Sequence, residues 1–231
     1  MANFFTDNSD LKFYVDQWID WEPIVELTEH LYRAPGSFGS AAEAREFYGE
    51  IFERVGEFVG SEIAPKAGEI DREGVSLVDG EAVFPPALTA IFEGIKALEL
   101  HGMCLPRELG GMNVPLMGYM INVELFSRAD VSVAAHHGFH GGIAAAMLLF
   151  SLREGSTAFD PETFTMKSTR WEEPIREIIA GESWGCMDIT EPDAGSDMAA
   201  LRTIGEQDDD GNWFVTGQKI FITSGHGKWH F

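Results

Sequence analysis

The hydrophobic pattern changes its period near residue 183, and this change constrains the fold more than any other feature of the chain. Before it, apolar residues recur every third or fourth position, which predicts amphipathic helices. After it, short apolar runs are separated by turn residues, which predicts strands at 184–190, 201–205, 213–216 and 219–223. We therefore expect a helical region over residues 1–182, followed by β structure over 183–231 that has too few strands for a sheet core of its own.

Several helices can be placed within the first part. One apolar face ends at Pro65, and it consists of Phe47, Ile51, Phe52, Val55, Phe58, Val59 and Ile63. Further helices are predicted over 88–98 after a proline pair, over 115–129 after a glycine-containing loop at 106–113, and over 171–180. Residues 11–31 read as a helical arm interrupted by Pro23, Asp79-Gly80 as a turn, and 151–170 as irregular.

Residues 131–150 contain no Asp, Glu, Lys or Arg, and the run is long enough to cross a bilayer. It also contains Ser132, three histidines and three glycines, all of which weaken membrane insertion. We therefore predict a central helix that is packed on all sides, capped by Asp130, and no membrane span. The histidines His136, His137 and His140 have no acidic partner within the run, so we expect core or pocket-lining side chains and no metal site.

Composition narrows the function and the location. The formal net charge is −22, with no basic stripe, which argues against nucleic-acid binding. Cys104 and Cys186 belong to no CxxC motif or Cys/His grid, and His226 and His230 are equally unsupported as metal ligands. The first residues show neither a basic nor a long apolar segment, so a cytoplasmic location is expected.

Two segments carry the chemical signal. Residues 187–197 read MDITEPDAGSD and residues 217–225 read GQKIFITSG. Each is a short apolar run that ends in Thr and then breaks on Pro or Gly, so each predicts a strand end with a hydroxyl and free backbone N–H groups. A flavin ring needs such donors along its polar edge and an aromatic cover on one face. Thr190, Thr223 and Phe221 would suit it, although threonines at strand ends equally suit ordinary turns.

These two segments resemble the flavin-contacting segments of the acyl-CoA dehydrogenases almost position by position. The intervening Arg202-Thr203, the loop 105–111 (LPRELGG) and the segment 124–130 (ELFSRAD) are also similar to that family, so the resemblance covers about residues 40–231. The arm and the irregular segment 150–170 resemble the longer-chain branch, which includes enzymes for 3-methylmercaptopropionyl-CoA. The implied fold is α+β: an all-helical N-terminal domain followed by the first strands of an incomplete β-barrel-like middle domain. The expected boundaries are 1–38 for the arm, 39–182 for the helical domain and 183–231 for the partial β domain.

The resemblance implies FAD as cofactor and assigns roles to individual residues. Groups near Met187, Ile189 and Thr190 would approach the pyrimidine edge of FAD, and Ser196 would lie where flavin and acyl-CoA meet. Thr223 would bond near N5, and Phe221, which replaces a common Trp, would cover the ring face away from the substrate.

The implied reaction is α,β-dehydrogenation of an acyl-CoA thioester, with electron-transfer flavoprotein as acceptor. In the family, a C-terminal helical domain carries the catalytic base and builds the oligomer, so no catalytic residue is expected within these residues. The chain would then be an N-terminal portion, inactive alone, of a homo-oligomer. An acyl-CoA oxidase and a non-catalytic subunit or binding module of the same fold remain alternatives.

Overall fold

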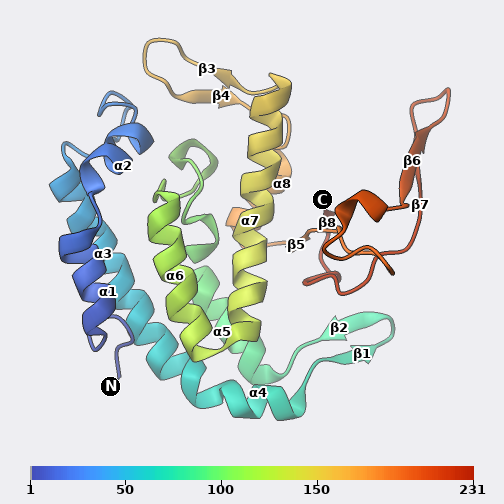
Figure 1. Ribbon diagram of the computed structural model, residues 1–231, viewed down its shortest axis with the longest axis horizontal. Helices are drawn as coiled ribbons and strands as arrows, with labels where there is room; N and C mark the ends of the chain where they lie inside the picture. The colour runs from blue at the N-terminus through green and yellow to red at the C-terminus, as the bar shows by residue number, and fades with distance from the viewer. Residues whose placement is uncertain (1) are drawn as a thin grey trace.

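The computed structural model describes residues 2–231 and shows a helical body with a small, mostly irregular β region beside it (Figure 1). The α-helices are α1 (Ser9–Phe13), α2 (Trp21–Thr28), α3 (Ala41–Phe58), α4 (Ala67–Glu73), α5 (Pro86–Ala97), α6 (Leu116–Ala129), α7 (Val131–Glu154) and α8 (Glu172–Ile179). Short 3₁₀ or π segments lie at Tyr14–Trp18, Val59–Ile63, Ala64–Lys66, Leu100–Gly102, Arg107–Leu109 and Met198–Ala200. The helical region predicted for the first part of the chain is confirmed.

Within residues 2–231, eight strands form four separate two-stranded sheets. Three are antiparallel: β1 (Ser76–Val78) with β2 (Glu81–Val83), β3 (Ala158–Phe159) with β4 (Met166–Ser168), and β6 (Ile204–Gln207) with β7 (Trp213–Thr216). The fourth is parallel and joins β5 (Gly185–Cys186) to β8 (Trp229–His230). The sequence predicted the turn at Asp79-Gly80 and strands at 201–205 and 213–216, which overlap β6 and β7, but not the two hairpins inside the helical part.

The core lies among α3, α5, α6 and α7, where Tyr48, Phe52 and Phe126 are fully buried. The N-terminal arm joins this core through Leu11, Val15, Trp21 and Val25. A second cluster lies between α7 and α8 and includes Ile143, Ile175 and Ile178. The long central helix α7 thus contacts both clusters.

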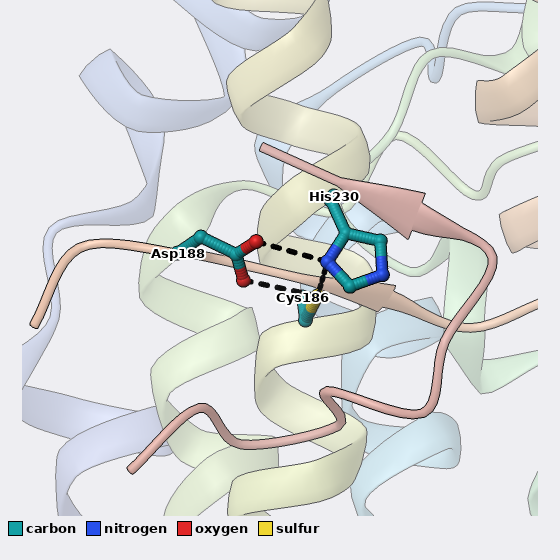
Figure 2. A group of neighbouring side chains, drawn as sticks. All are labelled: Cys186, Asp188 and His230. Atoms are coloured by element: carbon teal, nitrogen blue, oxygen red, sulfur yellow. Dashed lines mark hydrogen bonds and ion pairs between the residues drawn. The ribbon is translucent and has the colours of Figure 1, made fainter. Parts of the chain in front are cut away.

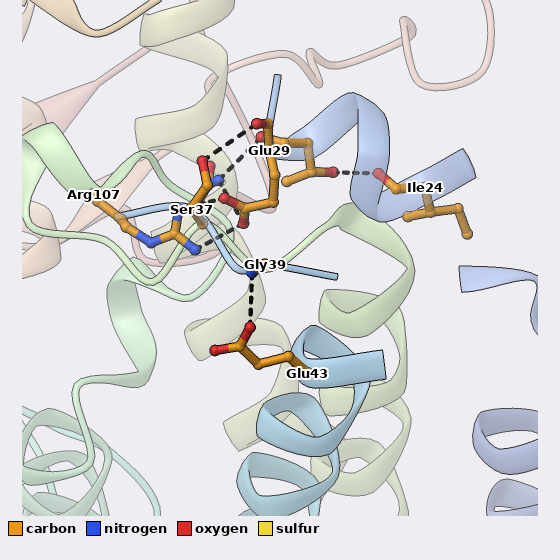
Figure 3. A network of polar contacts seen from close by, with 8 residues as sticks. Ile24, Glu29, Ser37, Gly39, Glu43 and Arg107 are labelled. Atoms are coloured by element: carbon orange, nitrogen blue, oxygen red, sulfur yellow. Dashed lines mark hydrogen bonds and ion pairs between the residues drawn. The ribbon is translucent and has the colours of Figure 1, made fainter. Parts of the chain in front are cut away.

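A buried ion pair ties the arm to the loop at 106–113 (Figure 3). Glu29 is fully buried, and its carboxylate accepts two parallel hydrogen bonds from Arg107, at 2.7 and 2.8 Å. Asn113 Nδ2 donates to the backbone oxygen of Thr28 at 3.2 Å. The planar guanidinium donates two parallel hydrogen bonds to the carboxylate, which fixes the position of the chain just after α2.

The predicted helix boundaries at Pro85-Pro86 and Asp130 are confirmed. Pro86 is the first residue of α5, where its missing N–H has no helical partner to lose. Asp130 accepts hydrogen bonds from the N–H groups of Ser132 and Val133, so it caps α7.

Two proline boundaries were predicted wrongly. Helical structure continues past Pro65, because this proline occupies the first turn of a new 3₁₀ segment that leads into α4. Pro23 likewise lies in the first turn of α2, and the break in the arm falls earlier, at Ile19 and Asp20.

The prediction that residues 131–150 are packed on all sides was also wrong. Val131 is 70% and Leu149 is 63% exposed, because neighbouring helices cover α7 on one side only. Among the described residues α7 is the one helix long and apolar enough to cross a bilayer, and half of its most apolar window is buried in the protein. The absence of a membrane span stays a prediction.

The predicted strand at 184–190 shrinks to two residues, and 219–223 forms no strand at all. Strand structure needs a neighbour along its length. Within residues 2–231, β5 finds only β8, while Phe221 (φ 57°) and Ser224 (φ 61°) turn the backbone away from extended geometry.

Candidate functional site

The two motif segments meet in the structure although neither is a strand there. The N–H of Ile220 donates to the backbone oxygen of Thr190 at 2.9 Å. Lys219 Nζ donates to the backbone oxygen of Ile189 at 3.1 Å. These two bonds bring residues about thirty positions apart together at one place.

Glu191 organises this meeting point, and sequence reasoning gave it no role. Its carboxylate is buried and accepts hydrogen bonds from the N–H groups of Arg202 (2.6 Å) and Thr203 (3.0 Å) and from Lys219 Nζ (2.8 Å). Lys219 first, and then these backbone donors, lower the pKa of Glu191 to about 2. A charged carboxylate therefore holds three parts of the chain at neutral pH. The signal available in the sequence was a Glu beside Pro and Gly turns, which is too common to single out.

The predicted cofactor residues surround this point but are not equally sheltered. Met187, Ile189, Thr190 and Thr223 are half-buried, whereas Ser196 and Phe221 are exposed, Phe221 to 88%. Thr223 lies in a turn and not at the end of the strand that was predicted over 219–223. Phe221 presents an open aromatic face.

Free donors remain at the meeting point. Among residues 2–231, the N–H groups of Ile189 and Thr190 and the hydroxyl of Thr223 find no hydrogen-bond acceptor. All three groups lie on the two segments joined by the Ile220–Thr190 bond. Such unpaired polar groups at the end of an irregular segment are suited to the polar edge of a ligand.

An apolar groove of about 380 Å³ runs between α6 and α7 and reaches Met187. Its lining consists of Tyr119, Val123, Ser127, Val131, Ala134, Ala135, Gly138, Phe139, Gly142, Ile143 and Met187. The Tyr119 hydroxyl donates to the backbone oxygen of Gly138 at 2.6 Å, so it is satisfied within the wall. Part of the exposed side of α7, at Val131 and Phe139, therefore lines this groove.

The histidines of α7 lie in a neutral cluster behind the site, together with His101 and Trp184. The rings of His101 and His140 are 4.3 Å apart, and those of His140 and Trp184 are 4.4 Å apart. His140 Nε2 lies 2.9 Å from the backbone oxygen of Ile178, which can only accept, so this nitrogen carries the proton. Burial lowers the pKa to about 4 for His101, about 3 for His137 and about 2 for His140.

One of these histidines contacts the second motif segment. His136 Nδ1 and the buried hydroxyl of Ser224 are 2.8 Å apart, and Ser224 directly follows Thr223. Burial lowers the pKa of His136 to about 4, so the imidazole is neutral at pH 7. His136 therefore holds the turn that carries Thr223.

The structure also joins residues that the sequence kept apart (Figure 2). Cys186, Asp188 and His230 form a compact group, in which His230 Nδ1 lies 3.1 Å from Cys186 Sγ and 2.9 Å from Asp188 Oδ2. Burial and the Asp188 carboxylate raise the pKa of Cys186 to about 12. Spacing could not reveal this group, since 44 positions separate Cys186 from His230.

Comparison with known proteins decides the family. The family described as "Acyl-CoA dehydrogenase, N-terminal domain" matches residues 46–156, and "Acyl-CoA dehydrogenase, middle domain" matches residues 186–230. The chain belongs to the acyl-CoA dehydrogenase family. The matched middle-domain segment contains all six residues predicted to bind the cofactor, although their individual roles stay predictions.

Individual acyl-CoA dehydrogenases agree with this assignment. The 3-methylmercaptopropionyl-CoA dehydrogenase of Ruegeria pomeroyi is 30% identical over 210 residues, covering 87% of this chain and 32% of that protein. Butyryl-CoA dehydrogenase from Megasphaera elsdenii matches with a TM-score of 0.59 at 21% identity, over 78% of this chain and 41% of that one. An acyl-CoA dehydrogenase from Bacillus anthracis complexed with FAD matches with a TM-score of 0.57 at 21% identity, over 82% of this chain and 27% of that one.

At these identities the two solved structures show the fold alone. They support the acyl-CoA dehydrogenase architecture of a helical domain followed by part of a β domain. The chain spans about a third of the length of the curated relative from Ruegeria pomeroyi.

Proposed function

We propose that this chain provides the helical and early middle-domain parts of an FAD-dependent acyl-CoA dehydrogenase. One observation carries the proposal: the apolar groove between α6 and α7 reaches Met187, beside the point where the two motif segments meet. An acyl chain needs an apolar channel that ends where its α and β carbons face the oxidant. The groove and the free donors together offer that arrangement.

The residues at the meeting point fit FAD. The N–H groups of Ile189 and Thr190 would hold its pyrimidine edge, and the Thr223 hydroxyl would lie near N5. When bound, FAD supplies the acceptor for the β-hydride of the substrate. Phe221 would cover the ring face away from the acyl-CoA, and its exposed side chain is free to do so.

Other residues of this chain would position the two motif segments and exclude water from the acyl chain. Lys219 and Glu191 hold the two segments in register through charge-assisted hydrogen bonds. The apolar wall of α7 would exclude water from the thioester end of the acyl chain, which strengthens electrostatic interactions there. Ser196 would lie where flavin and substrate meet.

By the family resemblance, the catalytic base comes from a C-terminal helical domain outside these residues. An α-proton beside a thioester becomes acidic only when the carbonyl is hydrogen-bonded and the base is desolvated. We therefore propose that residues 1–231 alone bind but do not turn over substrate. Electron-transfer flavoprotein as acceptor, a homo-oligomeric assembly and a cytoplasmic location are part of the same proposal.

An anaerobic titration of the intact, FAD-loaded protein with acyl-CoA esters of increasing chain length tests the function. We expect the flavin absorbance to bleach with at least one ester, because hydride transfer reduces the ring. An intact protein that binds no flavin, or whose flavin stays oxidised with every ester, would contradict the proposal. Peroxide formed after admitting air, with no transfer to electron-transfer flavoprotein, would instead indicate an acyl-CoA oxidase.

Two variants separate the cofactor from the substrate. Thr223→Val removes one donor at nearly constant shape, so we expect FAD affinity to fall about fivefold, the value of one net hydrogen bond. Ala135→Leu places a larger side chain in the groove, so we expect weaker acyl-CoA binding with unchanged FAD affinity. Equal effects of both variants on FAD affinity would show that the groove and the donors do not form separate subsites.

A further inference from the structure

Cys186, Asp188 and His230 form a group of neighbouring side chains (Figure 2), and none of the three lines the groove. Asp188 belongs to the first motif segment, whereas Cys186 and His230 lie outside both segments. Its three donor atoms are a sulfur, a carboxylate oxygen and an imidazole nitrogen, and they all lie within 4.8 Å of one another. The remaining contact, Cys186 Sγ to Asp188 Oδ1, measures 3.4 Å. One thiol, one carboxylate and one imidazole therefore point at a common centre.

These distances are close to those that a tetrahedral zinc ion imposes on its ligands. Bond lengths of about 2.3 Å to sulfur and about 2.0 Å to nitrogen or oxygen place the donors about 3.3 to 3.6 Å apart. Cys186 Sγ and His230 Nδ1 are 3.1 Å apart, and they contact different oxygens of Asp188, Oδ1 at 3.4 Å from Sγ and Oδ2 at 2.9 Å from Nδ1. Outward shifts of a few tenths of an ångström, with a small turn of the carboxylate, would open the centre. We propose that Cys186, Asp188 and His230 bind a zinc ion.

The backbone brings the ligands into place. Cys186 and His230 are directly opposite each other in the parallel pair of β5 and β8. The N–H of Asp188 donates to the backbone oxygen of Phe231 at 2.8 Å, which holds the third ligand against the same strand. The ion would therefore clip β8 to β5, where only two residue pairs now join them.

The site is separate from the proposed flavin and substrate sites. Side chains alternate along extended backbone, so Cys186 and Asp188 face one way and Met187, which lines the groove, faces the other. Asp188 is 28% and His230 49% exposed, so a fourth position is open to water. The inference therefore stands whether or not the proposed dehydrogenase activity is correct.

The donor set selects the metal. A thiolate with an imidazole suits zinc or cobalt, whereas magnesium and calcium require oxygen donors. Binding replaces the thiol proton of Cys186, which leaves to solvent, and the sulfur then bonds the metal as a thiolate. Cobalt(II) reports this bond directly, because a thiolate ligand gives an intense charge-transfer absorption in the near ultraviolet.

The test is a titration of the intact, untagged and metal-free protein with cobalt(II), followed by displacement with zinc. We expect one equivalent of cobalt, a sulfur-to-metal absorption band, and loss of that band when zinc is added. Partners that merely orient metal ligands change affinity by about 10- to 100-fold, so losing a ligand should weaken binding by more than about tenfold. Zinc should also raise the melting temperature of the wild-type protein.

Three ligand variants are measured: Cys186→Ser, Asp188→Asn and His230→Asn. Cys186 is fully buried, so its variant can fail to fold. Asp188 and His230 are partly exposed, so we expect their variants to fold, and these two variants decide the test. Matched controls are Cys104→Ser, which removes the other cysteine, and His30→Asn, an exposed histidine on the far arm. Unchanged cobalt binding in Asp188→Asn and His230→Asn, equal losses in the controls, or bound cobalt without a sulfur band would each overturn the site.

Discussion

Arg107 and Glu29 are 78 positions apart in the sequence, yet their side chains make the paired contact that fastens the N-terminal arm. Glu29 is fully buried and Arg107 is partly covered by the ring of Phe38, 5.2 Å away. Removing only the guanidinium would leave an unpaired carboxylate in the interior. A buried ion pair adds little net stability, but losing one partner is costly because the other charge stays buried. The pair therefore holds the arm in place.

The first prediction follows from that burial. We expect Arg107→Met to lower the free energy of unfolding by about 3 kcal/mol, because Glu29 stays buried without its partner. Replacing both residues, as Arg107→Met with Glu29→Leu, should recover most of that loss. Urea unfolding of the three proteins measures it, and a double variant as unstable as the single one would contradict this account.

His136 provides the second prediction at this scale, which rests on the proposed FAD site. We expect His136→Phe to weaken FAD binding about fivefold, since the ring packing is kept but the Ser224 hydrogen bond is lost. Ser224→Ala should have a similar effect, and the double variant should be no worse than either. Additive losses in FAD titrations would show that the two residues act separately. His136→Gln, which keeps a hydrogen-bonding side chain, should restore part of the affinity.

At the scale of elements, the sequence was sufficient wherever local rules decide. Pro86 starts α5 and Asp130 caps α7, because caps and proline preferences act within a few residues. The sequence was insufficient where a partner decides. Residues 219–223 have strand-like composition, but within residues 2–231 no strand pairs with them, so they turn.

The same limit applies to the candidate site. The motif residues identified the two segments. Because both segments resemble flavin-contacting segments, the sequence also predicted that they lie close together. The support from Glu191 and the contact of Cys186 with His230 depend on long-range folding that no local pattern encodes. The exposure of α7 was missed because an uncharged run is equally suited to a buried helix and to the wall of an apolar groove.

The β6–β7 hairpin carries a prediction of its own. It is exposed along both strands, including Trp213, Phe214 and Val215, and it projects from the helical body (Figure 1). An isolated two-stranded hairpin is marginally stable in water. In the 231-residue chain we therefore expect amides of residues 204–216 to exchange with deuterium much faster than those of the buried part of α7. Equal protection of both segments would contradict this expectation.

At the scale of the whole molecule, the buried histidines make the fold sensitive to acid. The pKa values of His101, His136, His137 and His140 all lie at about 4 or below, against 6.5 for an unburied imidazole. The unfolded chain therefore binds more protons than the folded one as the pH falls below 6.5. Stability is unaffected by these groups above that value and is lost progressively below it.

We expect this loss to begin near pH 6.5, well above the pH range in which the contribution of Glu191 is lost. With a lowered pKa of about 2, Glu191 stabilises the fold above pH 4.5, and its contribution is lost only as the pH falls from there towards 2. Urea midpoints between pH 7.5 and pH 5 measure the effect of the histidines. A flat profile over that range would show that the cluster is hydrated or charged in the folded protein.

We propose that residues 187–197 and 217–225 meet at the edge of the flavin, beside the groove between α6 and α7 that would hold the acyl chain. A crystal structure of the intact protein with FAD and an unreactive acyl-CoA analogue tests it most directly. We expect the isoalloxazine within hydrogen-bond distance of Thr190 and Thr223, with the acyl chain between α6 and α7. A flavin bound elsewhere, or an acyl chain outside that groove, would contradict it.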